Sequence, residues 1–191
     1  MIVKKIDSKI KKLLEDGKVG VLATDTIYGL VGSALKIKTV ERIYKIKKRN
    51  PKKPYIILIS SIKDLAKFSV KPKRAEKEIL NKYWPGRISF ILTCSSKKFS
   101  YLHRGTRSLA FRLPRKKSLI TLIKQTGPLV APSANPEGLP PAKNIKEAKK
   151  YFGNKIDFYV DSGLVKGKSS TLAEIRNGKL RVLRKGAVGI K

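Results

Sequence analysis

The chain has 191 residues, 41% of them hydrophobic, and its 45 Lys and Arg against 13 Asp and Glu give a formal net charge of +32. This composition excludes a disordered chain and predicts a single globular domain, residues 1–191, with a substantial core. The charge favours anionic partners such as nucleotides or RNA. The lysines are spread over the whole sequence, however, as in Lys-rich proteins of heat-adapted organisms. Charge alone therefore does not establish RNA binding.

Cys94 is the only cysteine, so the chain cannot form an intramolecular disulfide, which is usual for an intracellular protein. No apolar stretch approaches the length of a membrane span, and the N-terminus lacks the apolar segment of a signal peptide. We expect a cytoplasmic protein without membrane contact, in which Cys94 is a small core residue.

Buried strands and helices alternate along the chain. Short apolar runs predict strands over residues 19–23, 55–59, 88–93, 108–113, 127–135 and 156–160. Helical spacing and end signals predict helices over 8–16, from 39 to about 47, from 61, from 72 to 84, over 118–125 and over 144–152. The expected N-caps are Ser8, Thr39, Ser61 and Asn144.

The clearest local signal lies near the C-terminus. Strand-like residues 171–175 and 179–184 flank Asn177-Gly178, a pair that favours a type I′ hairpin. The order of elements predicts an α/β fold with a mixed sheet, closed by this antiparallel hairpin.

Several common sites are excluded. The sequence has no Walker phosphate loop and no Gly-x-Gly-x-x-Gly, and its one histidine rules out paired histidine ligands. A Ser-His-Asp triad with His103 is left open, but no nucleophile elbow surrounds Ser133. We expect His103 to lie in an exposed, basic loop.

Polar residues follow several of the predicted strands. Ser133 and Asn135 end the strand at 127–135 and would point the same way on an extended backbone, where open α/β sheets build sites. An ordinary turn explains them equally well. Lys47-x-Arg49 could grip a polyphosphate, and arginines at buried strand ends need an anion or a wet cleft. These arginines are Arg112 and Arg184, while Thr24, Thr26 and Tyr28 could add hydroxyl contacts.

Seven short blocks occur in a recognisable order. They are residues 24–30 (TDTIYGL), 47–49 (KKR), 84–86 (WPG), 111–114 (FRLP), 131–135 (APSAN), 170–171 (ST) and 183–186 (LRKG). In this order, from about Ile2 to Val188, the chain resembles the YrdC/Sua5 family of threonylcarbamoyl-AMP synthases, in its short single-domain form. The resemblance implies a twisted α/β fold around a deep, positively charged cavity.

The resemblance also implies a reaction: L-threonine, bicarbonate or CO₂, and ATP give threonylcarbamoyl-AMP and pyrophosphate, for threonylcarbamoyladenosine (t6A) in tRNA. The implied catalytic residues are Lys47, Arg49, Ser133 and Asn135. ATP would be held by these four with Ser108 and Arg184, and threonine by Thr24, Thr26, Tyr28, Arg112, Ala131 and Ser170. Mg²⁺ would accompany ATP, with no dedicated metal site. The product would pass to the tRNA threonylcarbamoyl-transferase machinery.

Several positions depart from the family pattern, including Ala23, Asn50 and the segment 136–143. Asn50 stands where the family usually has proline, and Pro141 lacks a hydroxyl often present there, so we assign Pro141 no side-chain contact with ATP. Two other functions are considered: a non-catalytic module that binds double-stranded RNA or tRNA, and carbamoyl-adenylate chemistry with another donor, as in hydrogenase-maturation proteins. Direct tRNA contact by the enzyme itself is left open.

Overall fold

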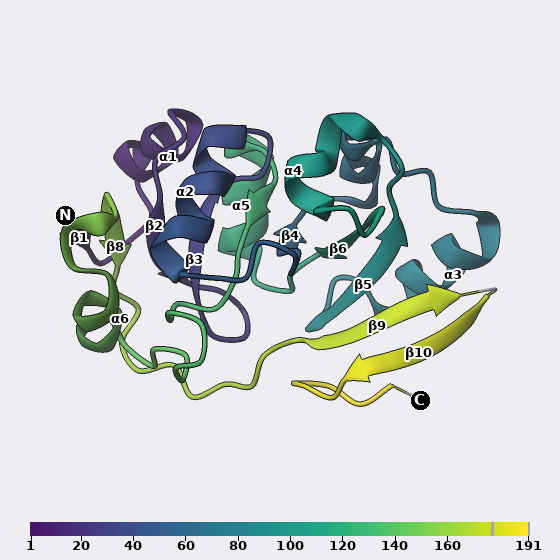
Figure 1. Cartoon of the computed structure of the whole chain (residues 1–191). Coiled ribbons are helices and arrows are strands. Elements are labelled where there is room, and N and C mark those ends of the chain that lie inside the picture. The colour runs from purple at the N-terminus through teal and green to yellow at the C-terminus, as the bar shows by residue number, and fades with distance from the viewer. Residues whose placement is uncertain (177, 191) are drawn as a thin grey trace.

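The computed structural model describes residues 1–176 and 178–190, and one ten-stranded sheet forms its centre (Figure 1). Its strands are β1 (Ile2–Val3), β2 (Gly20–Ala23), β3 (Tyr28–Ser33), β4 (Ile56–Leu58), β5 (Ile88–Thr93), β6 (Ser108–Arg112), β7 (Leu129–Val130), β8 (Phe158–Val160), β9 (Thr171–Arg176) and β10 (Lys179–Arg184). The order across the sheet is β1-β8-β2-β3-β7-β4-β6-β5-β9-β10. Parallel pairs such as β4/β6 and antiparallel pairs such as β5/β6 are both present, which confirms the predicted mixed sheet.

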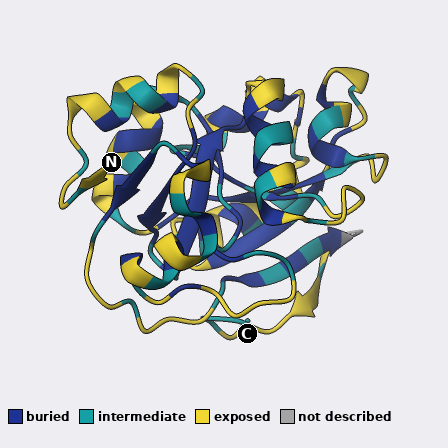
Figure 2. Ribbon diagram, turned by 60° about the vertical axis from the view of Figure 1, so that its left-hand side comes forward, coloured by how far each residue is buried: buried dark blue, intermediate teal, exposed yellow. Residues whose placement is uncertain are grey.

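Helices pack on the sheet through their apolar sides, and their outer sides are exposed (Figure 2). The α-helices are α1 (Ser8–Glu15), α2 (Ile37–Lys47), α3 (Arg74–Tyr83), α4 (Ser100–His103), α5 (Lys117–Thr126) and α6 (Ile145–Phe152). Short 3₁₀ helices are η1 (Ile62–Phe68), η2 (Lys97–Phe99) and η3 (Gly153–Lys155).

The two faces of the sheet bury different cores, because successive residues of a strand point to opposite faces. On β2, Val21 belongs to a large core that also holds residues of α2 and α6. Its neighbour Leu22 belongs to a smaller core with residues of α1 and α5. On β4, Ile57 likewise belongs to the large core and its neighbour Leu58 to the smaller one. Among the described residues, the smaller core includes none from β5, β6 or β9, so α1 and α5 cover only part of their face of the sheet.

Most predicted elements are present, with two differences. The strand predicted over 127–135 is only Leu129–Val130: Gly127 still caps α5, and the chain bends at 134–135. The strand β3 was not predicted, since Gly29 and Gly32 disfavour strands. Gly32 is nevertheless required: a Cβ there would lie 2.5 Å from the Thr39 methyl of α2.

Two of the four predicted N-caps are wrong. Asp7, not Ser8, caps α1, and α2 begins at Ile37, so that Thr39 lies inside it and donates to the carbonyl of Gly17 at 2.7 Å. The caps at Ser61 and Asn144 are confirmed. The hairpin of β9 and β10 is also confirmed, with Arg176 opposite Lys179. Its turn residue Asn177 lies outside the described residues.

Cys94 is buried, and its thiol donates to the carbonyl of Phe68 at 3.3 Å, as expected for a core residue. Within the described part of the chain, no helix has both the length and the apolar character needed to span a membrane.

Candidate active site

A cavity of about 300 Å³ lies over the part of the sheet face that α1 and α5 leave uncovered. Its floor comes from alternate residues of neighbouring strands, including Ile56 on β4 and Ser108, Ala110 and Arg112 on β6. Residues two apart on a strand share a face, which explains why all three β6 residues reach it. The floor of the site is therefore a face of the sheet, and residues at strand ends, such as Thr24 and Arg184, contribute to its walls.

The turn between β2 and β3 forms one wall of the cavity. The hydroxyls of Thr24 and Thr26 lie 3.0 Å apart, and the Thr24 hydroxyl donates to the carbonyl of Ile27 at 2.8 Å. Both threonines line the cavity, as predicted. Tyr28 does not line it: Tyr28 is on β3, where it points to the opposite face from Gly29. Its hydroxyl donates to the carbonyl of Gly163 at 2.8 Å.

Arg112 is a buried cation at the cavity wall, 4% exposed. Its Nη1 donates to the Thr26 hydroxyl at 2.9 Å, and its Nη2 lies 3.2 Å from Oδ1 of Asp25. The second contact is an ion pair without a hydrogen bond, since Asp25 Oδ1 has no hydrogen-bond partner among the described residues. Burial lowers the pKa of Arg112, and the carboxylate of Asp25 opposes that effect. Asp25 thus supplies the countercharge that a buried guanidinium needs.

Lys47, the last residue of α2, is 1% exposed and does not line the cavity. Its Nζ donates to the backbone carbonyl of Ser133 at 2.5 Å and to that of Asn135. The backbone N–H of Glu137 in turn donates to the carbonyl of Lys47 at 2.9 Å. Lys47 therefore joins the Lys-x-Arg segment to the Ser-x-Asn segment through the backbone. Burial, with repulsion from Arg49, lowers the pKa of Lys47 to about 7.

Ser133 and Asn135 point in different directions, contrary to the expectation for an extended strand. The N–H of Asn135 donates to the carbonyl of Ser133 at 3.0 Å, so the backbone turns between them. The Ser133 side chain lines the cavity. The amide of Asn135 instead donates to the carbonyls of Leu139 and Pro136 at 2.6 and 2.9 Å. Its buried Oδ1 has no hydrogen-bond partner among the described residues.

Two further arginines reach the cavity from outside the sheet face. Arg49 follows α2, and its Nε donates to the carbonyl of Lys53 at 3.2 Å. Arg184 ends β10, and its Nη2 donates to the carbonyl of Ser170 at 2.8 Å. With Arg112, they make the cavity basic, because its lining includes no Asp or Glu among the described residues.

The C-terminal segment returns to the cavity through a close backbone contact. The Thr171 hydroxyl donates to the carbonyl of Val188 at 2.5 Å and accepts from the N–H of Gly186 at 3.1 Å. A Cβ on Gly186 would lie 2.3 Å from the carbonyl oxygen of Ser169. The Ser-Thr and Arg-x-Gly blocks therefore meet, and this contact places Arg184 beside the cavity.

The structure brings most of the predicted site residues to one cavity. The lining includes Thr24, Thr26, Arg49, Ser108, Arg112, Ala131, Ser133, Ser170 and Arg184. Lys47, Asn135 and Tyr28 lie outside it, with their polar groups directed to backbone atoms. Sequence reasoning missed the lining residues Tyr55 and Thr106, which belong to none of the seven blocks.

A second hollow of about 660 Å³ adjoins the cavity and shares Ile27 and Ser169 with it. It lies between residues 140–143 and 164–169 and includes Pro141 and three lysines. The two segments are joined by the N–H of Val165, which donates to the carbonyl of Lys143 at 2.8 Å.

The prediction for His103 is wrong. His103 is 5% exposed, because it ends the short helix α4, which packs on the core through Leu102. Its Nδ1 accepts the N–H of Gly105 at 3.2 Å.

The residues present do not fit a protein-held Mg²⁺ site. Within residues 1–176 and 178–190, no three His, Cys, Asp or Glu side chains are grouped so that they could hold a metal ion. Mg²⁺ usually keeps several waters and is held by substrate phosphates with one or two carboxylates, and the cavity lining includes no Asp or Glu among the described residues.

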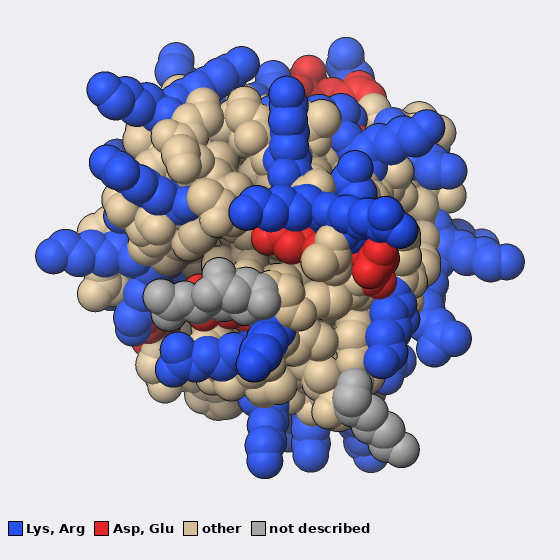
Figure 3. Space-filling model, turned by 90° about the vertical axis from the view of Figure 1, so that its right-hand side faces the viewer, with Lys and Arg blue, Asp and Glu red and all other residues tan. Residues whose placement is uncertain are grey.

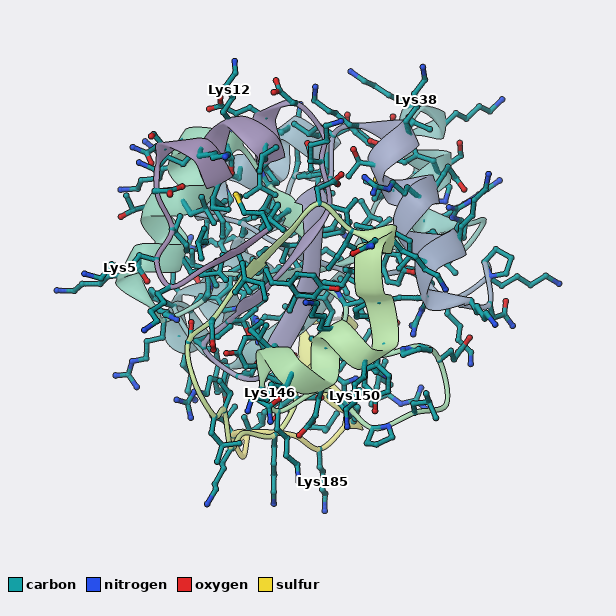
Figure 4. The ribbon with its side chains drawn as sticks, turned by 90° about the vertical axis from the view of Figure 1, so that its left-hand side faces the viewer. Lys5, Lys12, Lys38, Lys146, Lys150 and Lys185 are labelled. Carbon is teal, nitrogen blue, oxygen red and sulfur yellow. The ribbon has the colours of Figure 1, made fainter. Side chains whose placement is uncertain are left out.

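The positive charge is distributed around the molecule. One face shows Lys and Arg projecting in all directions around a few acidic side chains (Figure 3). On the opposite side, labelled lysines point outward from α1, α2, α6 and the C-terminal segment (Figure 4). No single surface element accounts for the net charge of +32.

Comparisons with known proteins identify the family and the fold of this chain. Residues 12–186 match the family model Sua5_yciO_yrdC, described as "Telomere recombination". A relative from Methanocaldococcus jannaschii, named for threonylcarbamoyl-AMP synthesis, is 30% identical over 190 residues, which are 98% of this chain and 89% of the relative. The threonylcarbamoyl-AMP synthase of Bacillus subtilis is 30% identical over 153 residues, which are 79% of this chain but only 44% of that enzyme.

A solved structure shows the same fold. The structure of Pyrococcus abyssi Sua5 complexed with L-threonine superposes with a TM-score of 0.88 at 27% identity. The match covers 97% of this chain and 57% of the Sua5 chain, so this chain spans a little over half of that protein.

Proposed function

This chain belongs to the Sua5–YciO–YrdC family, and we propose that it is a threonylcarbamoyl-AMP synthase. It would combine L-threonine, bicarbonate or CO₂, and ATP into threonylcarbamoyl-AMP and pyrophosphate, for t6A modification of tRNA. The observation that carries the proposal is the basic cavity, in which three arginines and several hydroxyls face one space without a lining carboxylate among the described residues. Such a cavity suits substrates that bring their own negative charge.

In the proposed first step, the free amine of threonine attacks the carbon of CO₂, a nitrogen–carbon bond forms and the amine loses a proton, which gives a carbamate. In the second step, a carbamate oxygen attacks the α-phosphorus of ATP. The bond from this phosphorus to the bridging oxygen breaks, and pyrophosphate leaves. Neither step needs a protein nucleophile; both need positioning and charge neutralisation.

The cavity residues have matching roles in this proposal. Arg112 would bind the threonine carboxylate, and Thr24 and Thr26 would keep that guanidinium in place and bound the amino-acid site. Ala131 and Ser170 would complete that site. Tyr28 lies outside the cavity and would act indirectly, by holding residues 162–163 through hydrogen bonds of its hydroxyl.

ATP would bind on the other side of the cavity. Arg49, Arg184, Ser108 and Ser133 would contact its phosphates and ribose, and the adjoining hollow would provide space for the rest of the nucleotide, since 300 Å³ is at the low end for a ligand site. Lys47 and Asn135 would act by fixing the loop that carries Ser133.

Incubation of the protein with ATP, threonine and bicarbonate, followed by mass spectrometry, tests the proposal. Threonylcarbamoyl-AMP should form only when all three substrates are present. No adenylate from a folded protein would refute the activity. An adenylate that forms with carbamoyl phosphate in place of threonine and bicarbonate would instead indicate carbamoyl transfer from another donor.

RNA binding is the second candidate, motivated only by the net charge of +32. The lysines project from several elements rather than from one surface (Figure 4), so we place it second. Backbone binding should weaken steeply with salt. A folded protein that makes no adenylate and still binds double-stranded RNA tightly at physiological salt would favour this candidate.

A further inference from the structure

Two stacked tyrosines lie between Arg49 and a second arginine beside the cavity. Tyr44, on α2, and Tyr55, just before β4, have ring centroids 4.2 Å apart and an interplanar angle of 25°. The guanidinium of Arg49 lies 5.2 Å from the Tyr55 ring centroid, and that of Arg104 lies 4.1 Å from the Tyr44 ring centroid. The four side chains therefore form a continuous series of contacts: Arg104, Tyr44, Tyr55 and Arg49.

Hydrogen bonds fix three of these four side chains. Nη2 of Arg104 donates to the carboxylate of Glu41 at 2.7 Å. The carbonyl of Lys53 accepts from the Tyr44 hydroxyl at 3.0 Å and from Nε of Arg49 at 3.2 Å. A ring face and one carbonyl thus confine the Arg49 guanidinium, while its two Nη groups have no hydrogen-bond partner among the described residues and are available to a ligand.

Tyr55 contributes its ring rather than its hydroxyl. The residue is 3% exposed and lines the cavity together with Arg49. Its buried hydroxyl has no hydrogen-bond partner among the described residues. A tyrosine that served hydrogen bonding would be expected to have such a partner. The interaction that Tyr55 offers is therefore its ring face, which attracts the guanidinium of Arg49.

We infer that Tyr55, backed by Tyr44, is a positioning residue that holds the Arg49 guanidinium toward the bound nucleotide. This inference rests on the proposed function for the identity of the ligand. Its physical basis is preorganisation: an arginine already confined loses less conformational freedom when an anion binds.

The test compares two substitutions at one position. Tyr55→Phe keeps the ring and removes only the unpartnered hydroxyl, so KM for ATP, KM for threonine and kcat should stay as in the wild type. Tyr55→Leu removes the ring face and should raise KM for ATP by about tenfold, the order expected for a lost cation–π contact, with KM for threonine unchanged. Tyr55→Met provides a second ring-free variant should Tyr55→Leu fail to fold.

Tyr159→Leu is the matched control for the loss of a buried tyrosine. Tyr159 is 3% exposed, lies on β8 and does not line the cavity. Its substitution should lower the unfolding temperature and leave KM for ATP unchanged. An equal rise in KM for ATP in Tyr159→Leu would show that the effect of Tyr55→Leu comes from lost stability, and would overturn the inference.

A second readout does not require activity. In protein labelled with ¹⁵N-arginine, the Nε–H signal of Arg49, identified by Arg49→Lys, should be shifted by the Tyr55 ring in the wild type and in Tyr55→Phe. In Tyr55→Leu it should lose this ring-induced shift, while the hydrogen bond from Nε to the Lys53 carbonyl remains. An unmoved signal together with an unchanged KM for ATP would refute the positioning role. A shifted wild-type signal without adenylate formation would refute the proposed function alone.

Discussion

Lys47→Met should change how the stability of the protein depends on pH. The Lys47 ammonium is 1% exposed and donates to two backbone carbonyls, those of Ser133 and Asn135. Burial lowers its pKa to about 7, whereas a lysine in an unfolded chain has a pKa of about 10.4. Between these values the unfolded state binds more protons than the folded state, so the free energy of unfolding rises with pH.

The size of this effect follows from the two pKa values. From pH 7 to pH 9, the folded state releases about half a proton, and the unfolded state keeps nearly all of its own. Integration over this window gives about 2 kcal/mol of added stability in the wild type from Lys47. Methionine does not titrate, so Lys47→Met should lack this increment. The substitution also removes a donor from both carbonyls. That of Asn135 loses its hydrogen-bond partner, which costs about 1–3 kcal/mol, whereas that of Ser133 keeps the N–H of Asn135.

Urea denaturation at pH 7, 8 and 9 and constant ionic strength measures the difference between wild type and Lys47→Met. The difference should grow by about 2 kcal/mol across this range. Lys45→Met is the control, because Lys45 is exposed in the same last turn of α2 and should leave the pH dependence unchanged. Equal pH dependence in wild type and Lys47→Met would show that the ammonium is not a buried, titrating link between the two loops.

Three further substitutions test separate parts of the site. Ser133→Ala should leave the free energy of unfolding within about 0.5 kcal/mol of the wild type, because the hydroxyl makes no hydrogen bond among the described residues. Adenylate formation should fall by on the order of 10²-fold. Unchanged turnover would show that Ser133 does not belong to the site. Asp25→Asn leaves the guanidinium of Arg112 buried without its countercharge, so it should lower the free energy of unfolding, measured by urea denaturation, by about 3–5 kcal/mol. Asp25→Glu keeps the charge and should lower it less. An unchanged free energy of unfolding in Asp25→Asn would mean that Arg112 does not depend on Asp25. Gly186→Ala should lower the free energy of unfolding by about 1–3 kcal/mol, since the new Cβ would lie 2.3 Å from the Ser169 carbonyl oxygen. The displaced segment should also move Arg184 and so weaken ATP binding. Wild-type stability and ATP binding would show that the C-terminal segment accommodates the methyl group.

The fold was largely predictable because hydrophobic periodicity reflects burial. The strands β5 and β6 and the helices α5 and α6 were located to within a residue or two. The strand β3 was missed because its two glycines carry no β-forming signal, and Gly32 is required for a long-range reason, the close approach of α2. Such tertiary requirements are not visible in a local window of sequence.

The candidate site was predictable as a set of residues but not as an arrangement. Nine predicted residues line one cavity, and eight of them, all but Ser108, belong to the ordered blocks. Lys47 was expected to contact ATP, whereas in the structure its ammonium donates to two backbone carbonyls in the interior. The direction of a side chain depends on a bend such as that at 134–135, which spacing alone does not reveal. Tyr44 and Tyr55 gave no signal because their stacking joins residues from two elements.

The central claim is that this one cavity joins threonine, CO₂ and ATP. The most direct measurement is incubation of the protein with ¹³C-bicarbonate, threonine and ATP, followed by mass spectrometry of the adenylate, with Ser133→Ala beside the wild type. The account predicts threonylcarbamoyl-AMP that is heavier by the one labelled carbon, with pyrophosphate in equal amount, and far less of both from Ser133→Ala. An adenylate without the label, or no adenylate from a protein shown to be folded, would contradict it.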